Sequence, residues 1–319
     1  MKISKDVKID LYTRMVRQRI FEDETTANFA SGEMPGFLHL SQGEDAVPAG
    51  VCSHLSNDDA IYTTHRGHGC IIAKGAEIKP MMAELFGRID GCCKGRAGSM
   101  HFADVKTGCM GSNGIVGEGM RIALGTAFAQ KYNKTKNITV VFFGEGATGT
   151  GAFHESFNMA STLKLPLVFV CNINLYAQMT PKSTHIAIED VADRAVGYGA
   201  PGVTIDGNDV EKVYEEFARA ARHARDGKGP YLLECKTYRH HGHFEGDPCN
   251  YRPEGELEEW KKKDPIVLYE KKLKKEGVLT DKEMQAIKDA ARKEVVDAVA
   301  FARASAMPEV EELYKDILA

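Results

Sequence analysis

Residues 138–149 of the 319-residue chain read ITVVFFGEGATG, an apolar run followed by a glycine-rich turn. The run has the composition of a buried strand, and closely spaced glycines are typical of a tight turn. Residues 152–164 continue with apolar positions at helical spacing, and residues 167–171 (LVFVC) form a second apolar run. This succession of strand, turn, helix and strand predicts a parallel sheet with helices on both faces.

Segments further out extend the alternation and add helices at both ends. Two more strands are expected at residues 202–205 and 231–237, with a helix between them at residues 209–226. A further helix is expected near the start of the chain, over residues 5–31. Another is expected from residue 264 onward, at an Asp-Pro helix start, and a third over residues 280–305, at a capping box.

The expected architecture is therefore α/β, a parallel sheet with helical N- and C-terminal extensions. We expect one domain over residues 1–319, divided into a helical arm (1–40), an α/β core (41–255) and C-terminal helices (256–319). Residues 90–119 differ from the rest of the core, because they are rich in glycine and show no period. Loops of this length are usually functional or disordered, and the embedded apolar residues favour a functional loop.

The composition excludes several classes of protein. Lys plus Arg (41) nearly balances Asp plus Glu (45), whereas nucleic-acid binders usually show a basic excess. No apolar run approaches the roughly 20 residues of a membrane-spanning helix, and no signal peptide is expected. The eight cysteines include no CxxC pair, so we expect reduced thiols in a cytoplasm rather than a disulfide or zinc framework.

The glycine turn admits two hypotheses. Its GxGxxG pattern after a strand favours a nicotinamide-dependent Rossmann oxidoreductase. However, the second strand ends in Asn172-Ile-Asn174 without the acidic residue that would hold a ribose, and Glu145 would repel a phosphate. A Mg²⁺ ion between carboxylate and phosphate removes this repulsion, with Glu145 and Asn174 as ligands at neighbouring strand ends. The start of the helix at residues 149–153 would then offer backbone N–H groups to a diphosphate.

These residues carry a family resemblance. Gly144-Glu-Gly146 followed by Asn172-x-Asn174-Leu-Tyr176 resembles the thiamine diphosphate motif. The whole chain is similar to the alpha subunit of the decarboxylating component of 2-oxo acid dehydrogenase complexes. Within this family, the sequence is most similar to the alpha subunits of bacterial acetoin dehydrogenase and pyruvate dehydrogenase. The matching stretches read THRGHG (64–69), GSMH (98–101), GIVG (114–117) and TYRHHGH (237–243).

The resemblance implies a role for each matched residue. Mg²⁺ would be held by Glu145, Asn174 and the backbone carbonyl of Tyr176. The active-site histidine pair would be His68 and His243, which would stabilise or protonate oxygen on the substrate. The cofactor would be bound by His65, Arg66, Gly114, Val116, Gly144, Glu145, Gly146, Ala147, Asn174 and Tyr176.

The resemblance also implies an activity and partners. The chain would cleave acetoin or decarboxylate pyruvate with thiamine diphosphate and Mg²⁺, and would pass the acyl group to a lipoyl acyltransferase. A beta subunit would complete the active site in a complex of two alpha and two beta chains, and a dihydrolipoyl dehydrogenase would act with them. A branched-chain 2-oxo acid dehydrogenase alpha subunit remains an alternative, as do the Rossmann oxidoreductase and a non-catalytic assembly subunit.

Overall fold

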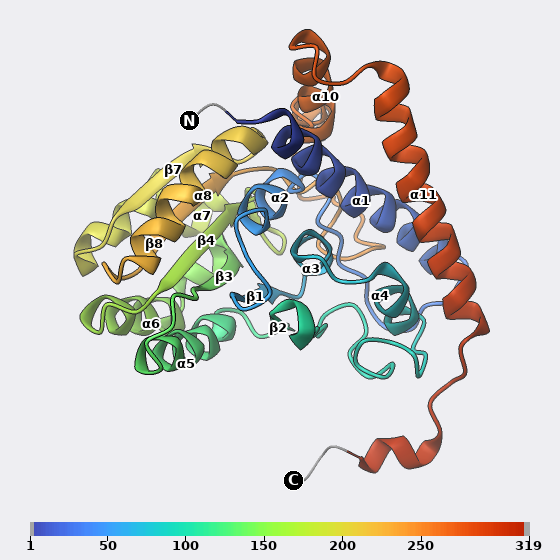
Figure 1. The fold of residues 1–319 in the computed structure, drawn as a ribbon, viewed down its shortest axis with the longest axis horizontal. Coiled ribbons are helices and arrows are strands. Elements are labelled where there is room, and N and C mark those ends of the chain that lie inside the picture. Colours follow the sequence, from blue (N-terminus) through green and yellow to red (C-terminus); the bar gives the residue numbers. More distant parts are fainter. Residues whose placement is uncertain (1–2, 316–319) are drawn as a thin grey trace.

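The computed structural model describes residues 3–315 and is built on a six-stranded parallel sheet (Figure 1). The strands lie in the order β2-β1-β3-β4-β8-β7, and each neighbouring pair is parallel. Their bounds are Ala60–Thr64 (β1), Cys109–Asn113 (β2), Thr139–Gly144 (β3), Leu167–Ile173 (β4), Gly202–Asp206 (β7) and Tyr231–Lys236 (β8). The predicted parallel sheet is confirmed, and its centre is the apolar run of β3.

Alternate residues of the central strands face two separate apolar cores. In β3, Val140 and Phe142 belong to one core, whereas Val141 and Phe143 belong to the other. Side chains of successive strand residues point to opposite faces, so this division follows from the strand itself. Each face is thus covered by apolar helix surfaces, as expected for a parallel sheet.

Different sets of helices cover the two faces of the sheet (Figure 1). One core includes residues of α1 (Lys5–Ala30), α2 (Ala46–Cys52), α3 (His68–Lys74), α4 (Ile78–Leu85), α8 (Val210–Arg225), α10 (Pro265–Lys275) and α11 (Asp281–Ala304). The opposite core includes residues of α5 (Glu118–Tyr132), α6 (Gly151–Thr162) and the 3₁₀ helix η3 (Val191–Tyr198). The N- and C-terminal helices α1 and α11 pack against each other, so the two extensions form one layer.

Short elements complete the described chain. They are η1 (Val105–Thr107), η2 (Glu145–Gly149), β5 (Tyr176–Ala177), β6 (Thr180–Pro181), α7 (Lys182–His185), α9 (Glu256–Lys261) and η4 (Val310–Tyr314). Within residues 3–315, no helix is both long and apolar enough to cross a membrane.

The glycine-rich segment 90–119 is ordered and contains elements that its composition did not predict. Its residues 109–113 form β2, which pairs with β1 at one edge of the sheet. α5 begins at Glu118, directly after the segment's last turn. The predicted loop is therefore partly a strand. Of its apolar residues, Phe102 is fully buried in the core, whereas Ile115 and Val116 are exposed.

Candidate active site

The predicted site residues gather at one edge of the sheet, where its parallel strands end. His65 and Arg66 follow β1, Gly114 follows β2, Glu145 follows β3, and Asn174 follows β4. In open α/β sheets, ligands bind outside the carboxyl ends of the strands. The topology therefore accounts for how residues far apart in sequence meet.

A cavity of about 520 Å³ lies at this edge. Eleven of the twelve predicted site residues line it: His65, Arg66, Gly114, Val116, Gly144, Glu145, Gly146, Ala147, Asn174, Tyr176 and His243. His68 does not line the cavity. The first turn of α6 does not line it either, and there the side chain of Thr150 accepts the N–H of Phe153.

Oxygen atoms suited to a hard divalent cation line the cavity at the ends of β3 and β4. Oε1 of Glu145 is buried without a hydrogen-bond partner, and so is Oδ1 of Asn172. Oε2 of Glu145 accepts the N–H of Asn174 at 3.3 Å. Burial raises the pKa of Glu145 to about 7, because the charged form of a carboxyl group is disfavoured away from water. Buried unpaired oxygens of this kind fit Mg²⁺, which prefers oxygen ligands.

Glu44 fixes the orientation of the two asparagine amides. One carboxylate oxygen accepts the Nδ2 of Asn172 at 2.8 Å, and the other accepts the Nδ2 of Asn174 at 2.9 Å. Since both amide nitrogens point to Glu44, both amide oxygens are directed elsewhere. Sequence reasoning missed Glu44 because it lies in the segment before α2, remote from the recognised motif.

Two buried arginines line the cavity together with the carboxylates of Glu44 and Glu145. Arg66 donates to the backbone carbonyls of Leu40 and His243, the second at 2.8 Å. Arg239 donates to the carbonyls of Gln178 and His241 and to a tyrosine hydroxyl. Within the described residues, neither guanidinium forms an ion pair with a carboxylate. Buried charges are normally paired, so this cavity is suited to an anionic ligand such as a diphosphate.

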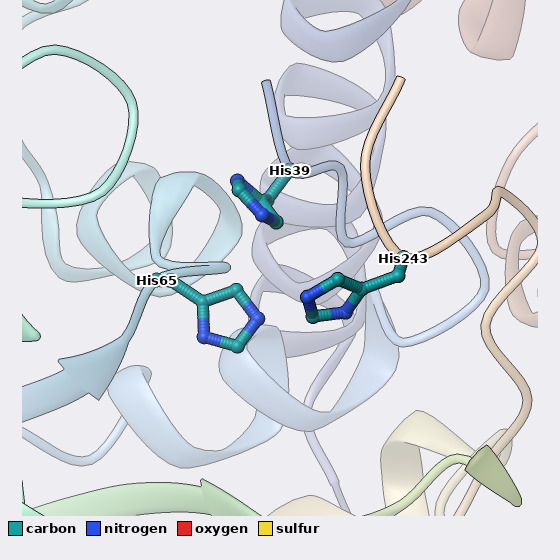
Figure 2. Close-up of side chains that lie close together, drawn as sticks. All are labelled: His39, His65 and His243. Carbon is teal, nitrogen blue, oxygen red and sulfur yellow. The ribbon is translucent and has the colours of Figure 1, made fainter. Parts of the chain in front are cut away.

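Three histidine rings face one another at the wall of the cavity (Figure 2). Ring centroids of His39 and His65 are 4.8 Å apart, and each lies 5.2 Å from that of His243. Burial, with the nearby Arg66 charge, lowers their pKa to about 3 for His39, about 2 for His65 and about 4 for His243. The rings are therefore neutral at pH 7, and Nδ1 of His39 and of His243 are buried without a partner.

The segment before α2 brings His39 to this cluster. It lies beside the segment after β8, because the N–H of His240 donates to Gln42 and the N–H of Glu245 donates to Leu38. At Gly43 the two segments approach so closely that an added Cβ would lie 2.2 Å from the carbonyl oxygen of Tyr238. No sequence motif singled out His39, since this pairing links positions some two hundred residues apart.

His68 lies behind the cavity wall and not at its surface. Its side chain is fully buried, with Nδ1 3.4 Å from Glu22 and Nε2 3.0 Å from the hydroxyl of Ser99. The same hydroxyl accepts the backbone N–H of His39 at 3.3 Å. The structure thus places His68 in the core at the start of α3, whereas His39 lines the cavity; a role for His68 beside the cofactor stays a prediction.

The fold and the cavity define an α/β protein whose parallel sheet ends in a cavity lined by two buried arginines and by buried oxygens of Glu145 and Asn172. Comparison with known proteins gives the family: the model of the family described as "Dehydrogenase E1 component" matches residues 13–311, and the chain belongs to this family. No carboxylate follows β4 as a dinucleotide ribose would need, and the family match sets the Rossmann alternative aside.

Full-length relatives include subunits that act on two different substrates. The chain is 44% identical to the alpha subunit of acetoin:2,6-dichlorophenolindophenol oxidoreductase of Bacillus subtilis, over 99% of this chain and 95% of the relative. It is 40% identical to the subunit of the same name in Cupriavidus necator, over 99% and 96%. It is 36% identical to the pyruvate dehydrogenase E1 component subunit alpha of Rickettsia felis, over 99% and 97%.

Proposed function

We propose that the chain is the alpha subunit of a thiamine diphosphate-dependent dehydrogenase that acts on acetoin or pyruvate. The observation that carries the proposal is a cavity whose lining includes two buried guanidinium groups and the buried, unpartnered oxygens of Glu145 and Asn172. This arrangement suits a diphosphate together with a divalent cation. Acetoin is the favoured substrate, because identity is higher to the two acetoin relatives than to the pyruvate relative.

Each group of lining residues has a part in this proposal. Glu145, Asn174 and the carbonyl of Tyr176 would hold Mg²⁺, with Arg66 and Arg239 beside the diphosphate. Irregular backbone at Gly114 and Val116 would hold the aminopyrimidine ring. The remaining contacts with the cofactor would come from His65, Gly144, Gly146 and Ala147.

Bound thiamine diphosphate would supply a nucleophilic carbon that serves as an electron sink. His39 and His243, held neutral, can each donate one hydrogen bond from one ring nitrogen and accept one at the other. Their role is to hold the substrate oxygen and to move a proton to or from it. His68, which contacts the hydroxyl of Ser99 as His39 does, would support His39 from behind the cavity wall.

The chain would act with partners. A beta subunit, in a complex of two alpha and two beta chains, would contribute the glutamate that activates the cofactor. A lipoyl acyltransferase would accept the acyl group, and a dihydrolipoyl dehydrogenase would reoxidise the lipoyl group. A cytoplasmic location is part of the proposal, supported by eight cysteines that form no disulfide.

The first test is substitution of the proposed cation ligand. Glu145→Gln should weaken Mg²⁺-dependent cofactor binding, measured by calorimetry on the chain with its beta partner, while the circular dichroism spectrum is retained. Unchanged affinity would remove Glu145 from the site. Steady-state assays of the wild-type pair with acetoin, pyruvate and branched-chain 2-oxo acids would then identify the substrate, and activity with none of them would refute the proposal.

A further inference from the structure

The three histidines at the cavity wall come from three separate segments of the chain. His39 precedes α2, His65 follows β1, and His243 follows β8. One ring nitrogen of each histidine lies within 4.8 Å of one ring nitrogen of each of the other two. Figure 2 shows the three rings turned toward one another. This group has the residue type and the number of ligands of an open zinc site, in which three histidines leave a fourth position free.

The ring nitrogens of this cluster are free to act as ligands. Nδ1 of His39 and Nδ1 of His243 are buried and have no hydrogen-bond partner. Within residues 3–315, the ring of His65 takes part in no hydrogen bond either. His241 shows the contrast, because its two ring nitrogens contact polar side chains at 3.1 and 3.2 Å. A buried polar atom without a partner is uncommon and indicates a water, ion or ligand that completes the site.

The spacing of the three rings matches that of a tetrahedral metal site. With Zn–N bonds of about 2.0–2.1 Å, a tetrahedral ion lies roughly 3 Å from the centre of each imidazole ring and holds the ring centres about 5 Å apart. The ring centres of His39, His65 and His243 are 4.8, 5.2 and 5.2 Å apart, and the ring planes cross at angles of 75°, 78° and 63°. Planes that cross so steeply let the rings surround a common point instead of stacking on one another.

We propose that His39, His65 and His243 form a binding site for a divalent transition-metal ion of the Zn²⁺ class. Imidazole nitrogen suits such ions, whereas Mg²⁺ prefers oxygen, so this site and the oxygens of Glu145 select different ions. The fourth position opens to the cavity, where water or a small anion can occupy it. No spacing motif predicts the site, because its ligands come from segments that only the fold brings together.

Charged neighbours determine how tightly the ion is held. Arg66 and Arg239 line the same cavity and oppose an added cation, whereas the carboxylates of Glu44 and Glu145 favour it. The two guanidinium charges make this site weaker than a zinc site that has no cation beside it. We therefore expect an ion that a chelator removes, and not a structural zinc ion that stays bound through purification.

A bound ion would affect the chemistry of the cavity. It would occupy ring nitrogens of His39 and His243 that the proposed function assigns to the substrate oxygen. Zn²⁺ would therefore inhibit the enzyme reversibly, and a chelator would restore the activity. This consequence rests on the proposed function, whereas the binding of the ion does not.

Titration of the full-length, cofactor-free chain with Co²⁺ in excess Mg²⁺ tests the binding. Tetrahedral Co²⁺ gives intense visible d–d bands, whereas Co²⁺ bound octahedrally to the oxygens beside Glu145 gives only weak ones. We expect intense bands that saturate at one Co²⁺ per chain and that Zn²⁺ removes. Weak bands alone, or bands that Mg²⁺ removes, would refute the proposal in the wild-type chain without any variant.

Variants at His65 identify the ligands. His65→Gln should weaken Co²⁺ binding at least tenfold, whereas His185→Gln, at an exposed histidine of α7, should leave it unchanged. His65→Cys should keep the tetrahedral bands and add a near-ultraviolet band from thiolate to Co²⁺ that the wild-type chain lacks. This gained band distinguishes an exchanged ligand from a lost fold. Unchanged affinity in His65→Gln, or a His65→Cys chain without the new band, would overturn the assignment.

Activity measurements separate the site from its consequence. Zn²⁺ should inhibit turnover by the chain with its beta partner, in competition with the substrate, and excess chelator should restore it. If Co²⁺ binds as expected but Zn²⁺ leaves turnover unchanged, the metal site stands and the role proposed for His39 and His243 is wrong.

Discussion

Glu44 is a buried carboxylate that holds the side-chain amides of Asn172 and Asn174 in one orientation. Its replacement by glutamine keeps the shape but offers only one accepting oxygen. One asparagine amide is then free to rotate and direct its nitrogen to the cation. Loss of groups that orient metal ligands typically costs 10- to 100-fold in metal affinity.

We therefore expect Glu44→Gln to weaken Mn²⁺ binding, measured by electron paramagnetic resonance in competition with Mg²⁺, by about tenfold or more. Glu216→Gln is the matched control, since Glu216 is also a buried carboxylate but lies on α8 and pairs with the hydroxyl of Tyr231. Equal Mn²⁺ affinity of wild type and Glu44→Gln would show that the amides are fixed by other contacts.

Because the buried histidines are neutral in the folded chain, the protein should lose stability as the pH falls. Burial lowers the pKa of His39 to about 3, whereas in the unfolded chain it titrates near 6.5. As the pH falls below 6.5 the unfolded chain binds a proton that the folded chain does not, so stability is lost between pH 6.5 and about 3. We expect the free energy of unfolding to fall by about 1–2 kcal/mol per such histidine from pH 6.5 to 5.

Urea unfolding of the cofactor-free chain at pH 7 and 5 measures this loss. His39→Gln should reduce the difference between the two pH values, while His101→Gln, at an exposed side chain, should not. The same loss in all three proteins would mean that His39 contributes nothing to acid sensitivity.

Residues were predictable where a motif follows directly from a strand end. Glu145 and Asn174 were placed correctly at the cavity because the strands before them are unmistakably apolar. His68 and His39 show the limit of this reasoning. Which histidine faces the cavity depends on where α3 begins and on a long-range pairing between two irregular segments, and neither leaves a periodic pattern in the sequence.

Strands and helices with a continuous apolar pattern, such as β3, β4 and α8, were predictable as elements. β2 was not, because its sequence CMGSN is short, polar and contains glycine, and its position depends on pairing with β1. Tertiary context commonly overrides weak strand propensity in this way. The capping box of α11 is the opposite case, because a local signal determines a local structure.

The capping box at the start of α11 should contribute to the stability of the protein. The side chain of Thr280 accepts the N–H of Glu283, and the side chain of Glu283 accepts the N–H of Thr280. Thr280→Ala should lower the free energy of unfolding by about 1 kcal/mol, and Thr280→Ser should restore most of it. Calorimetric melting of the three proteins would check this, and a melting temperature unchanged by Thr280→Ala would mean that α11 does not need its cap.

On the scale of the whole molecule, one side of α5 shows large apolar residues to solvent. Ile122 and Phe128 are each 49% exposed, and Tyr132 is 77% exposed. Ile115 and Val116, at the cavity, are exposed as well. Exposed apolar surface next to a ligand cavity is typical of a protein interface. A partner that covers α5 would thus also close the cavity, as the proposed beta subunit would.

We expect the chain to bind thiamine diphosphate at least tenfold more tightly with its beta partner than alone, measured by calorimetry in Mg²⁺. Phe128→Asp should weaken assembly with the beta chain in analytical ultracentrifugation. Val296→Asp, at an equally exposed apolar residue of α11, should not. Tight cofactor binding and full activity of the isolated chain would refute the interface.

The order of the strands in the sheet has a consequence for synthesis on the ribosome. β4 keeps an open edge until β8 pairs with it, and β7 joins the sheet only through β8. At roughly 5–20 residues per second, the roughly 60 residues from the end of β4 to the end of β8 take about 3–12 s to emerge. For that time the nascent chain presents an unpaired apolar strand edge, which favours aggregation. We expect chains stalled before β8 to be cleaved by protease much faster, and to bind chaperones more strongly, than chains stalled after it.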